Sequence, residues 1–204
     1  MRKIKICGLS RQKDIETVNI VKPDYCGFII DFPKSRRNVS AETVRQLCSE
    51  LSGDITPVGV FVDAPVQTVA GLLNDGTVSV AQLHGHEDED YIAALRSLTD
   101  KTLWQAFQVS GKAEIESALA SSADFVLLDA GQGSGRAFDW SLIDNFPRAF
   151  GLGGGLNSEN VSDAMETSAV LLDVSGGVET DGYKDAEKIK EFVGIVRDAD
   201  RRGI

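Results

Sequence analysis

The first cysteine of the chain stands where a side chain could carry out acid–base chemistry. The segment RKIKIC at residues 2–7 alternates apolar and polar positions, and Gly8 follows at once. Period-two alternation is typical of a short β-strand, and a glycine after it lets the backbone turn sharply. Cys7 therefore ends a strand on the same face as Lys5. A thiol beside a lysine is more readily ionised, and a thiolate can act as a base.

Further polar side chains stand at or just past the ends of other apolar runs. They are, in chain order, Asp31, Asp63, Gln82, His84, Asp129 and Asp173. No Ser-His-Asp set can be assembled from them, and two histidines are too few for a multi-histidine metal site, so no metal is expected. His84 could line a pocket as a hydrogen-bond donor or pack at a strand end. Asp173 is expected behind the reacting groups rather than among them.

Two glycine-rich segments indicate a phosphate group in the ligand. GLGGGLNSENV covers residues 151–161 and DVSGGVE covers residues 173–179, and each follows an apolar run. Backbone N–H groups in such turns bind phosphate, helped by a helix N-terminus, and barrel enzymes often place a phosphate site after strands seven and eight. The alternative is that both segments are tight turns without a ligand.

Two other loops could serve the same site. FPKSRRNVS at residues 32–40 is most simply a solvated basic loop, but above a phosphate site one of its arginines could hold a second anionic group. The glycines within LLDAGQGSGRAFDW at residues 127–140 predict a mobile loop that could close over the substrate and exclude water.

The elements that must position these residues alternate along the chain. Strands are predicted at residues 2–7, 25–30, 55–62, 78–84, 101–109, 123–129, 148–154 and 168–175. Helices are predicted at residues 11–21, 40–51, 65–74, 89–98, 112–122, 157–167 and 185–202, and residues 139–144 form a short helix at most. Ser40 is a plausible N-cap of its helix.

Eight strand–helix units favour an α/β fold, a compact (β/α)8 TIM barrel. No Pro- or Ser-rich linker divides the sequence, so residues 1–204 are expected to form a single catalytic domain. The alternative, an open doubly wound sheet, usually has fewer strands and a glycine-rich turn after the first one. In a barrel, the active site lies at the carboxyl ends of the strands, which would bring the candidate residues to one rim.

The composition excludes several classes of partner. A net charge of -10, from 31 acidic and 21 basic residues, argues against a nucleic-acid partner. There is neither an apolar run long enough for a membrane span nor a signal peptide at the start, so a cytoplasmic protein without a membrane partner is expected. The other two cysteines, Cys26 and Cys48, are expected to serve packing, because the spacing forms no disulfide framework or zinc site.

Several motifs follow one another along nearly the whole chain. They are KICG at 5–8, KS-x-R at 34–37, GVFV at 59–62, QLHG at 82–85, LLD with G-x-G-x-x-FDW at 127–140, GGL-x-x-x-NV at 154–161, and DVS-x-GVE with G-x-KD at 173–185. In this order they resemble the phosphoribosylanthranilate isomerase family of tryptophan biosynthesis. The resemblance implies a TIM barrel that converts N-(5-phosphoribosyl)anthranilate into 1-(2-carboxyphenylamino)-1-deoxyribulose 5-phosphate by an Amadori rearrangement, without a cofactor.

The resemblance also implies roles for individual residues. The cysteine of KICG, Cys7, becomes the general base, and the aspartate of LLD, Asp129, becomes the general acid. The family usually reads S-P-R in the loop after the second strand, whereas this chain has Arg36 and Arg37 after Ser35; the motif maps the carboxylate-binding arginine to Arg37, with Arg36 as the alternative. The resemblance also places the substrate phosphate on Gly154, Gly155, Ser175, Gly176 and Gly177. Apart from the resemblance, Lys5, Gln82, His84 and Asp173 are expected to contact the substrate as well.

Two expectations concern how these groups work together. Strands one and six are expected across the barrel from each other, so that Cys7 and Asp129 flank a bound sugar. Lys5 is expected to point into the barrel and favour the thiolate of Cys7, whose ordinary pKa is about 8.5.

Two other functions remain open at this stage. The first is a barrel that binds a phosphorylated sugar without turning it over. The second is the sister sugar-phosphate isomerase of histidine biosynthesis, which usually has an aspartate in the position of Cys7 and a longer chain. The sequence leaves open whether the protein is a monomer or a homodimer.

Overall fold

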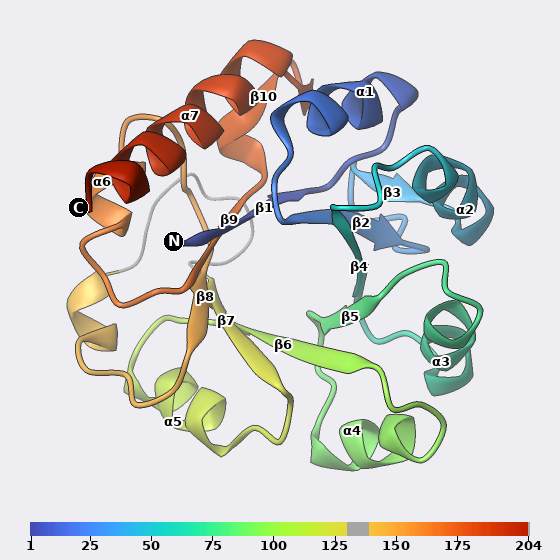
Figure 1. The fold of residues 1–204 in the computed structure, drawn as a ribbon. Helices are drawn as coiled ribbons and strands as arrows, with labels where there is room; N and C mark the ends of the chain where they lie inside the picture. Colours follow the sequence, from blue (N-terminus) through green and yellow to red (C-terminus); the bar gives the residue numbers. More distant parts are fainter. Residues whose placement is uncertain (130–138, 204) are drawn as a thin grey trace.

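The strands form the inner wall of the molecule and the helices surround them (Figure 1). The computed structural model describes residues 1–129 and 139–203. The strands of the inner wall are β1 (Lys3–Cys7), β2 (Tyr25–Ile30), β4 (Thr56–Phe61), β5 (Val80–Leu83), β6 (Thr102–Gln108), β7 (Phe125–Asp129), β8 (Phe150–Leu152) and β9 (Leu171–Val174). Each coincides with a predicted strand or lies within it, because both faces of a barrel strand are buried and its sequence is mostly apolar.

The order of the strands shows that the sheet closes on itself. Neighbours run β1-β9-β8-β7-β6-β5-β4-β2, and β2 pairs with β1 to complete the circle. All these pairings are parallel, and Lys5 is in register with Tyr25 on one side and Asp173 on the other. The structure therefore confirms the predicted (β/α)8 barrel.

Helices cover the outside of the barrel. They are α1 (Gln12–Val21), α2 (Ala41–Ser49), α3 (Val66–Asn74), α4 (Glu89–Arg96), α5 (Lys112–Ala120), α6 (Val161–Ala164) and α7 (Ala186–Arg202). Ser40 caps α2 as predicted, accepting a hydrogen bond from the N–H of Thr43 at 3.1 Å. Within the described ranges no helix is both long and apolar enough to cross a membrane.

Several short elements differ from the prediction or were not predicted. The helix expected at residues 157–167 shrinks to the single turn α6, and residues 139–144 contain only the 3-10 helix η1 (Trp140–Ile143). A two-residue strand, β3 (Asn38–Val39), joins β2. After β9 a 3-10 turn, η2 (Gly176–Val178), leads into an antiparallel hairpin of β10 (Glu179–Thr180) and β11 (Tyr183–Lys184). Strands of two residues, such as β3, β10 and β11, are too short to show an alternating pattern, so the sequence did not predict them.

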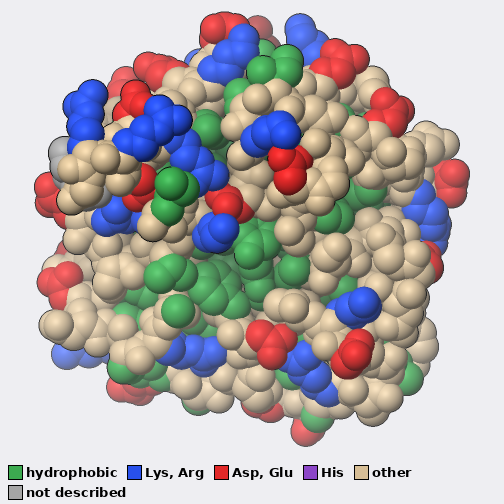
Figure 2. Space-filling model, viewed as in Figure 1, with side chains coloured by type: hydrophobic (Ala, Val, Ile, Leu, Met, Phe, Trp, Pro, Cys, Tyr) green, Lys and Arg blue, Asp and Glu red, His purple; other side chains and the backbone are tan. Residues whose placement is uncertain are grey.

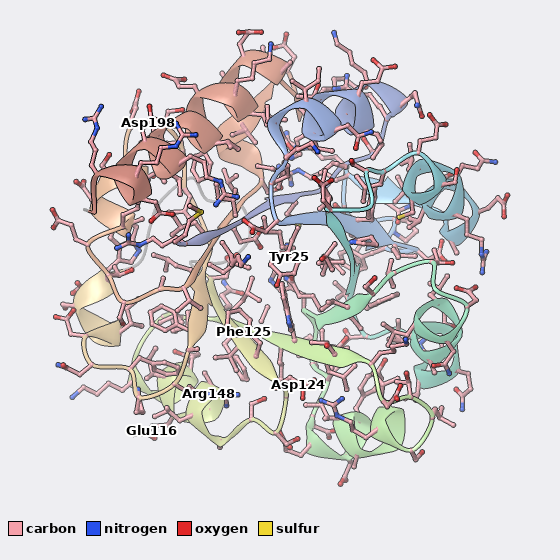
Figure 3. All side chains as sticks on the ribbon, viewed as in Figure 1. Tyr25, Glu116, Asp124, Phe125, Arg148 and Asp198 are labelled. Carbon is pink, nitrogen blue, oxygen red and sulfur yellow. The ribbon has the colours of Figure 1, made fainter. Side chains whose placement is uncertain are left out.

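The barrel interior is apolar where the strands begin and polar where they end. Val58, Val80, Trp104, Leu127 and Leu171 form an inner cluster, separate from the larger core between strands and helices. Trp104 also packs against the rings of Tyr25 and Phe125, which lie near the centre of the view in Figure 3. Figure 2 shows hydrophobic side chains gathered in the middle of this face. The polar candidate residues thus belong to the opposite rim of the barrel.

Candidate active site

Cys7 ends β1 and meets Lys5 inside the barrel. Both side chains are buried, and Lys5 is completely inaccessible to solvent. A β-carbon at Gly27, on the neighbouring strand β2, would lie 2.8 Å from Cys7 Sγ and 3.0 Å from Lys5 Cε. Glycine at this position therefore gives the thiol and the lysine side chain room to lie side by side.

The charge of Lys5 is balanced by Asp173 on the adjacent strand β9. Lys5 Nζ donates to both carboxylate oxygens, at 3.0 and 2.9 Å. Burial opposes the charge on Lys5, but Asp173 and Cys7 outweigh burial and raise the pKa of Lys5 above its ordinary value. Lys5 is thus a buried cation beside the thiol, a position that favours an effect on Cys7 over direct contact with a substrate.

Burial and charge act in opposite directions on Cys7. Burial raises the pKa of the thiol above its ordinary value, while the ammonium of Lys5 lowers it. The net shift is upward, so the effect of burial exceeds that of Lys5 in the substrate-free protein.

Asp129 stands at the end of β7, with its carboxylate at the rim. A β-carbon at Gly153, just after β8, would lie 3.0 Å from Asp129 Oδ2 and 3.7 Å from Asp173 Cβ. Asp129 and Asp173 therefore flank the same glycine. The expectation that Cys7 and Asp129 lie directly across the barrel from each other is wrong, because only strands β8 and β9 separate β7 from β1 on one side of the ring. Both residues nevertheless stand at the carboxyl ends of their strands, at the same mouth. The predicted mobile loop lies largely at residues 130–138, outside the described residues.

The two glycine-rich loops touch each other at this rim. A β-carbon at Gly177 would lie 1.9 Å from the carbonyl oxygen of Leu156. Gly154 and Gly155 have φ of 82° and 72°, a conformation that favours glycine. Among the described residues, no hydrogen-bond acceptor faces the N–H of either one. The loops can therefore offer backbone donors to an anion, although the single turn of α6 adds little of the expected helix dipole.

Ser175 connects the second glycine loop to the end of β1. Its Oγ donates to the carbonyl oxygen of Cys7 at 3.0 Å. A β-carbon at Gly8 would lie 3.3 Å from the same Oγ. The Ser175 hydroxyl thus connects the second glycine-rich loop to the backbone of Cys7.

Both candidate arginines reach one carboxylate, that of Glu179. Arg37 binds it through two hydrogen bonds, of 2.6 and 2.8 Å, and Arg36 through one of 2.6 Å. The side chain of Arg37 is 18% exposed and that of Arg36 is 60% exposed. Because a β-carbon at Gly8 would lie 2.4 Å from Arg37 Cδ, Arg37 covers the end of β1.

Glu179 and Lys184 are site residues that the sequence reasoning missed. Lys184 Nζ lies 2.5 Å from Glu179 Oε1, and both side chains are buried. Burial opposes the charge of Glu179, but Arg37 and Lys184 outweigh it and lower the pKa of the carboxyl to about 2. The signal was present in the GVE and G-x-KD motifs, to which no role had been given.

The remaining candidates divide between the interior and the outer loops. Gln82 is buried in β5, with its Nε2 3.3 Å from His84 Nδ1, and no described group donates to its Oε1. Asp63 is exposed and lies 3.1 Å from His86, and Asp31 is also exposed. Gln82 and His84 therefore face the mouth as a pair, whereas Asp31 and Asp63 lie outside the group built around Cys7.

Comparison with known proteins identifies the family to which the chain belongs. A family model described as N-(5'phosphoribosyl)anthranilate (PRA) isomerase matches residues 4–194. A relative of the same description from Endomicrobium trichonymphae is 43% identical over 203 residues, which cover 97% of this chain and 99% of the relative. The chain belongs to the PRA isomerase family. It is therefore an isomerase of tryptophan biosynthesis that acts on a phosphorylated sugar.

Solved PRA isomerase structures share the fold over the full length. One, in complex with reduced 1-(o-carboxyphenylamino)-1-deoxyribulose 5-phosphate, has a TM-score of 0.84 at 31% identity and covers 100% of both chains. Another, of monomers generated from the dimeric PRA isomerase of Thermotoga maritima, has a TM-score of 0.84 at 32% identity and the same coverage. These neighbours support the barrel fold over the full length of the chain.

Proposed function

We propose that Cys7 and Asp129 carry out the Amadori rearrangement of N-(5'-phosphoribosyl)anthranilate to 1-(2-carboxyphenylamino)-1-deoxyribulose 5-phosphate. The single observation that supports this most is their placement at the ends of β1 and β7, on two sides of one barrel mouth. The buried pair of Lys5 and Asp173 lies beside Cys7, and Gly153 lies beside Asp129.

The reaction needs one acid and one base. Protonated Asp129 gives its proton to the ring oxygen as the furanose opens, which leaves an iminium ion at C1'. Cys7, as thiolate, then takes the proton from C2', and the electron pair of that C–H bond forms the enolamine. Tautomerisation of the enolamine gives the ketone, so substrate and product have the same composition. Each group is expected to contribute about 10²- to 10⁴-fold to the rate.

Each end of the substrate is an anion, and each is placed against hydrogen-bond donors of the chain. The phosphate is placed on the N–H groups of Gly154 and Gly155 and on the loop of Ser175, Gly176 and Gly177. The anthranilate carboxylate is placed on Arg37 or Arg36. Three cations surround the single carboxylate of Glu179, so this corner attracts anions although the whole chain is acidic. Fixing both ends holds the sugar between base and acid.

A turnover assay distinguishes an isomerase from a barrel that binds a phosphorylated sugar without converting it. We would add freshly prepared N-(5'-phosphoribosyl)anthranilate to the purified chain and follow the loss of its fluorescence. Rapid decay is expected. Tight binding in calorimetry without any decay would instead identify a phosphosugar receptor.

The other expectations stay predictions. These are a single domain over residues 1–204, a cytoplasmic location, a reaction without cofactor or metal, and a monomer or a homodimer. Sedimentation of the purified chain would decide the oligomeric state.

A further inference from the structure

The hairpin of β10 and β11 lies against the catalytic end of β1, and the mechanism above uses its residues only as part of a positively charged corner. Glu179 and Lys184 are paired residues of this hairpin, and their side chains are only 4% and 2% exposed. Arg11, in the loop after β1, donates to the carbonyl oxygen of Lys184 and lies 4.5 Å above the ring of Tyr183. The hairpin is thus held firmly over that loop.

Lys184 connects the hairpin to Cys7 through Ser175. Its Nζ donates to the carbonyl oxygen of Ser175 at 3.0 Å and to Ser175 Oγ at 3.4 Å. Ser175 Oγ in turn donates to the carbonyl oxygen of Cys7 at 3.0 Å. A buried ammonium is therefore linked to the backbone carbonyl of Cys7 through the hydroxyl of Ser175.

We propose that Lys184, held by Glu179, is a positioning residue that stabilises the thiolate of Cys7 and fixes Ser175 against the end of β1. The proposal rests on the proposed role of Cys7 as base. It names a residue that acts through Cys7 and does not itself touch the reacting atoms.

A comparison of the charged groups around Cys7 supports this role. Lys5 and Asp173 form one pair, so their charges largely cancel. Glu179 carries one negative charge against the positive charges of Arg36, Arg37 and Lys184. The excess positive charge near Cys7 therefore comes from the hairpin side.

The effect of Lys184 on the pKa of Cys7 has the direction that the proposal requires. Lys184 lowers the pKa of Cys7, as Lys5 does more strongly, whereas burial and Asp173 raise it. Cys7 also interacts with Arg37 and, on β2, with the thiol of Cys26. Burial lowers the pKa of Lys184 itself, and Glu179 opposes this change. Glu179 thus helps to keep the ammonium charged.

The test is the pH dependence of Cys7 alkylation by iodoacetamide in the full-length chain, read by peptide mass spectrometry so that Cys26 and Cys48 are scored separately. In Lys184→Met, the alkylation profile should move to higher pH by about one unit, so that Cys7 reacts about tenfold more slowly near neutral pH. The kcat should fall in parallel while KM changes less than about twofold. Lys184→Arg should restore most of both.

Lys188→Met is the matched control. Lys188 Nζ also contacts Glu179, but at its backbone carbonyl oxygen, 2.8 Å away, and Lys188 is exposed on α7. This variant should leave the Cys7 profile unchanged. Glu179 keeps two arginines in Lys184→Met, so no buried carboxylate loses all its partners. If that variant still fails to fold, Lys184→Gln, which keeps a donor for Ser175 without the charge, carries the same prediction.

Two results would overturn the proposal. An unchanged Cys7 alkylation profile in Lys184→Met would show that Lys184 does not act on the thiol. A rise in KM alone would make Lys184 a ligand for the substrate phosphate. Full activity of Cys7→Ser would instead refute the proposed base, and the alkylation profile would still report on Lys184, so the two failures are distinguishable.

Discussion

At the scale of single residues, the site depends on small gaps that glycine leaves open. Gly27 has normal strand geometry, but its missing side chain makes room for Cys7 and Lys5. Neither the period-two pattern of YCGFII nor its composition distinguishes this glycine from one tolerated in any strand. The contact crosses between β1 and β2, so it becomes visible only when the two strands are paired.

Gly27→Ala should therefore reduce activity. Its β-carbon would lie 2.8 Å from Cys7 Sγ, so the thiol must move. We expect kcat to fall at least about tenfold, since a small displacement of a reacting group costs that much or more. The control is Gly71→Ala on α3, where a β-carbon meets nothing within 4 Å. That variant should keep full activity and be more stable by about 0.5–1 kcal/mol. Equal activity of both variants would contradict the proposed geometry.

A second prediction for a single residue concerns how Glu179 affects the stability of the protein at acidic pH. Its pKa falls from an ordinary 4.5 to about 2 on folding, so it stabilises the protein above about pH 4.5 and this contribution is lost as the pH falls toward 2. Glu179→Gln should be less stable than the unmodified chain at neutral pH. It should also lose less stability between about pH 5 and pH 3, as measured by urea unfolding. Parallel losses in both proteins would show that the carboxylate is not stabilised by its cations.

At the scale of elements, the strands and most helices were predictable and the short connections were not. Strands such as YCGFII and FVLLD are apolar on both faces and bounded by turn residues, which single-sequence patterns reveal. The helix expected at residues 157–167 shrinks to one turn because side chains of its own segment bind the backbone instead. Asn157 accepts from the N–H groups of Glu159 and Asn160, which favours a turn.

The contact between the two glycine-rich loops gives a prediction at the element scale. Gly177→Ala would place a β-carbon 1.9 Å from the carbonyl oxygen of Leu156, so the loops must separate. We expect KM to rise about tenfold or more, with weaker competitive inhibition by inorganic phosphate, because the two loops would no longer surround one anion. Gly194→Ala on α7, where a β-carbon meets nothing within 4 Å, is the control. An unchanged inhibition constant for phosphate in Gly177→Ala would place the phosphate elsewhere.

At the scale of the whole molecule, the number of strand–helix units predicted the closed barrel, but not its charge pairings. Lys5 and Asp173 are 168 residues apart in the sequence, and Arg37 and Glu179 are 142 apart. Such pairs form because closure of the barrel brings β9 against β1, and because the hairpin meets the loop after β2 through Glu179. The two catalytic candidates, Cys7 and Asp129, could be read from the sequence because each stands at the end of a strand. The charged partners that surround these groups could not be predicted, because no local pattern in the sequence indicates a contact between distant segments.

The central claim is that Cys7 and Asp129 act on a sugar held between them. It is tested most directly by the turnover rate of Cys7→Ser and Asp129→Asn on N-(5'-phosphoribosyl)anthranilate, with binding of a reduced product analogue measured on the same samples and Cys48→Ser as the control. We predict that each catalytic variant loses about 10²- to 10⁴-fold in kcat, binds the analogue within about threefold of the unmodified chain, and that Cys48→Ser is unaffected. Turnover within about threefold of normal in either catalytic variant would contradict the account.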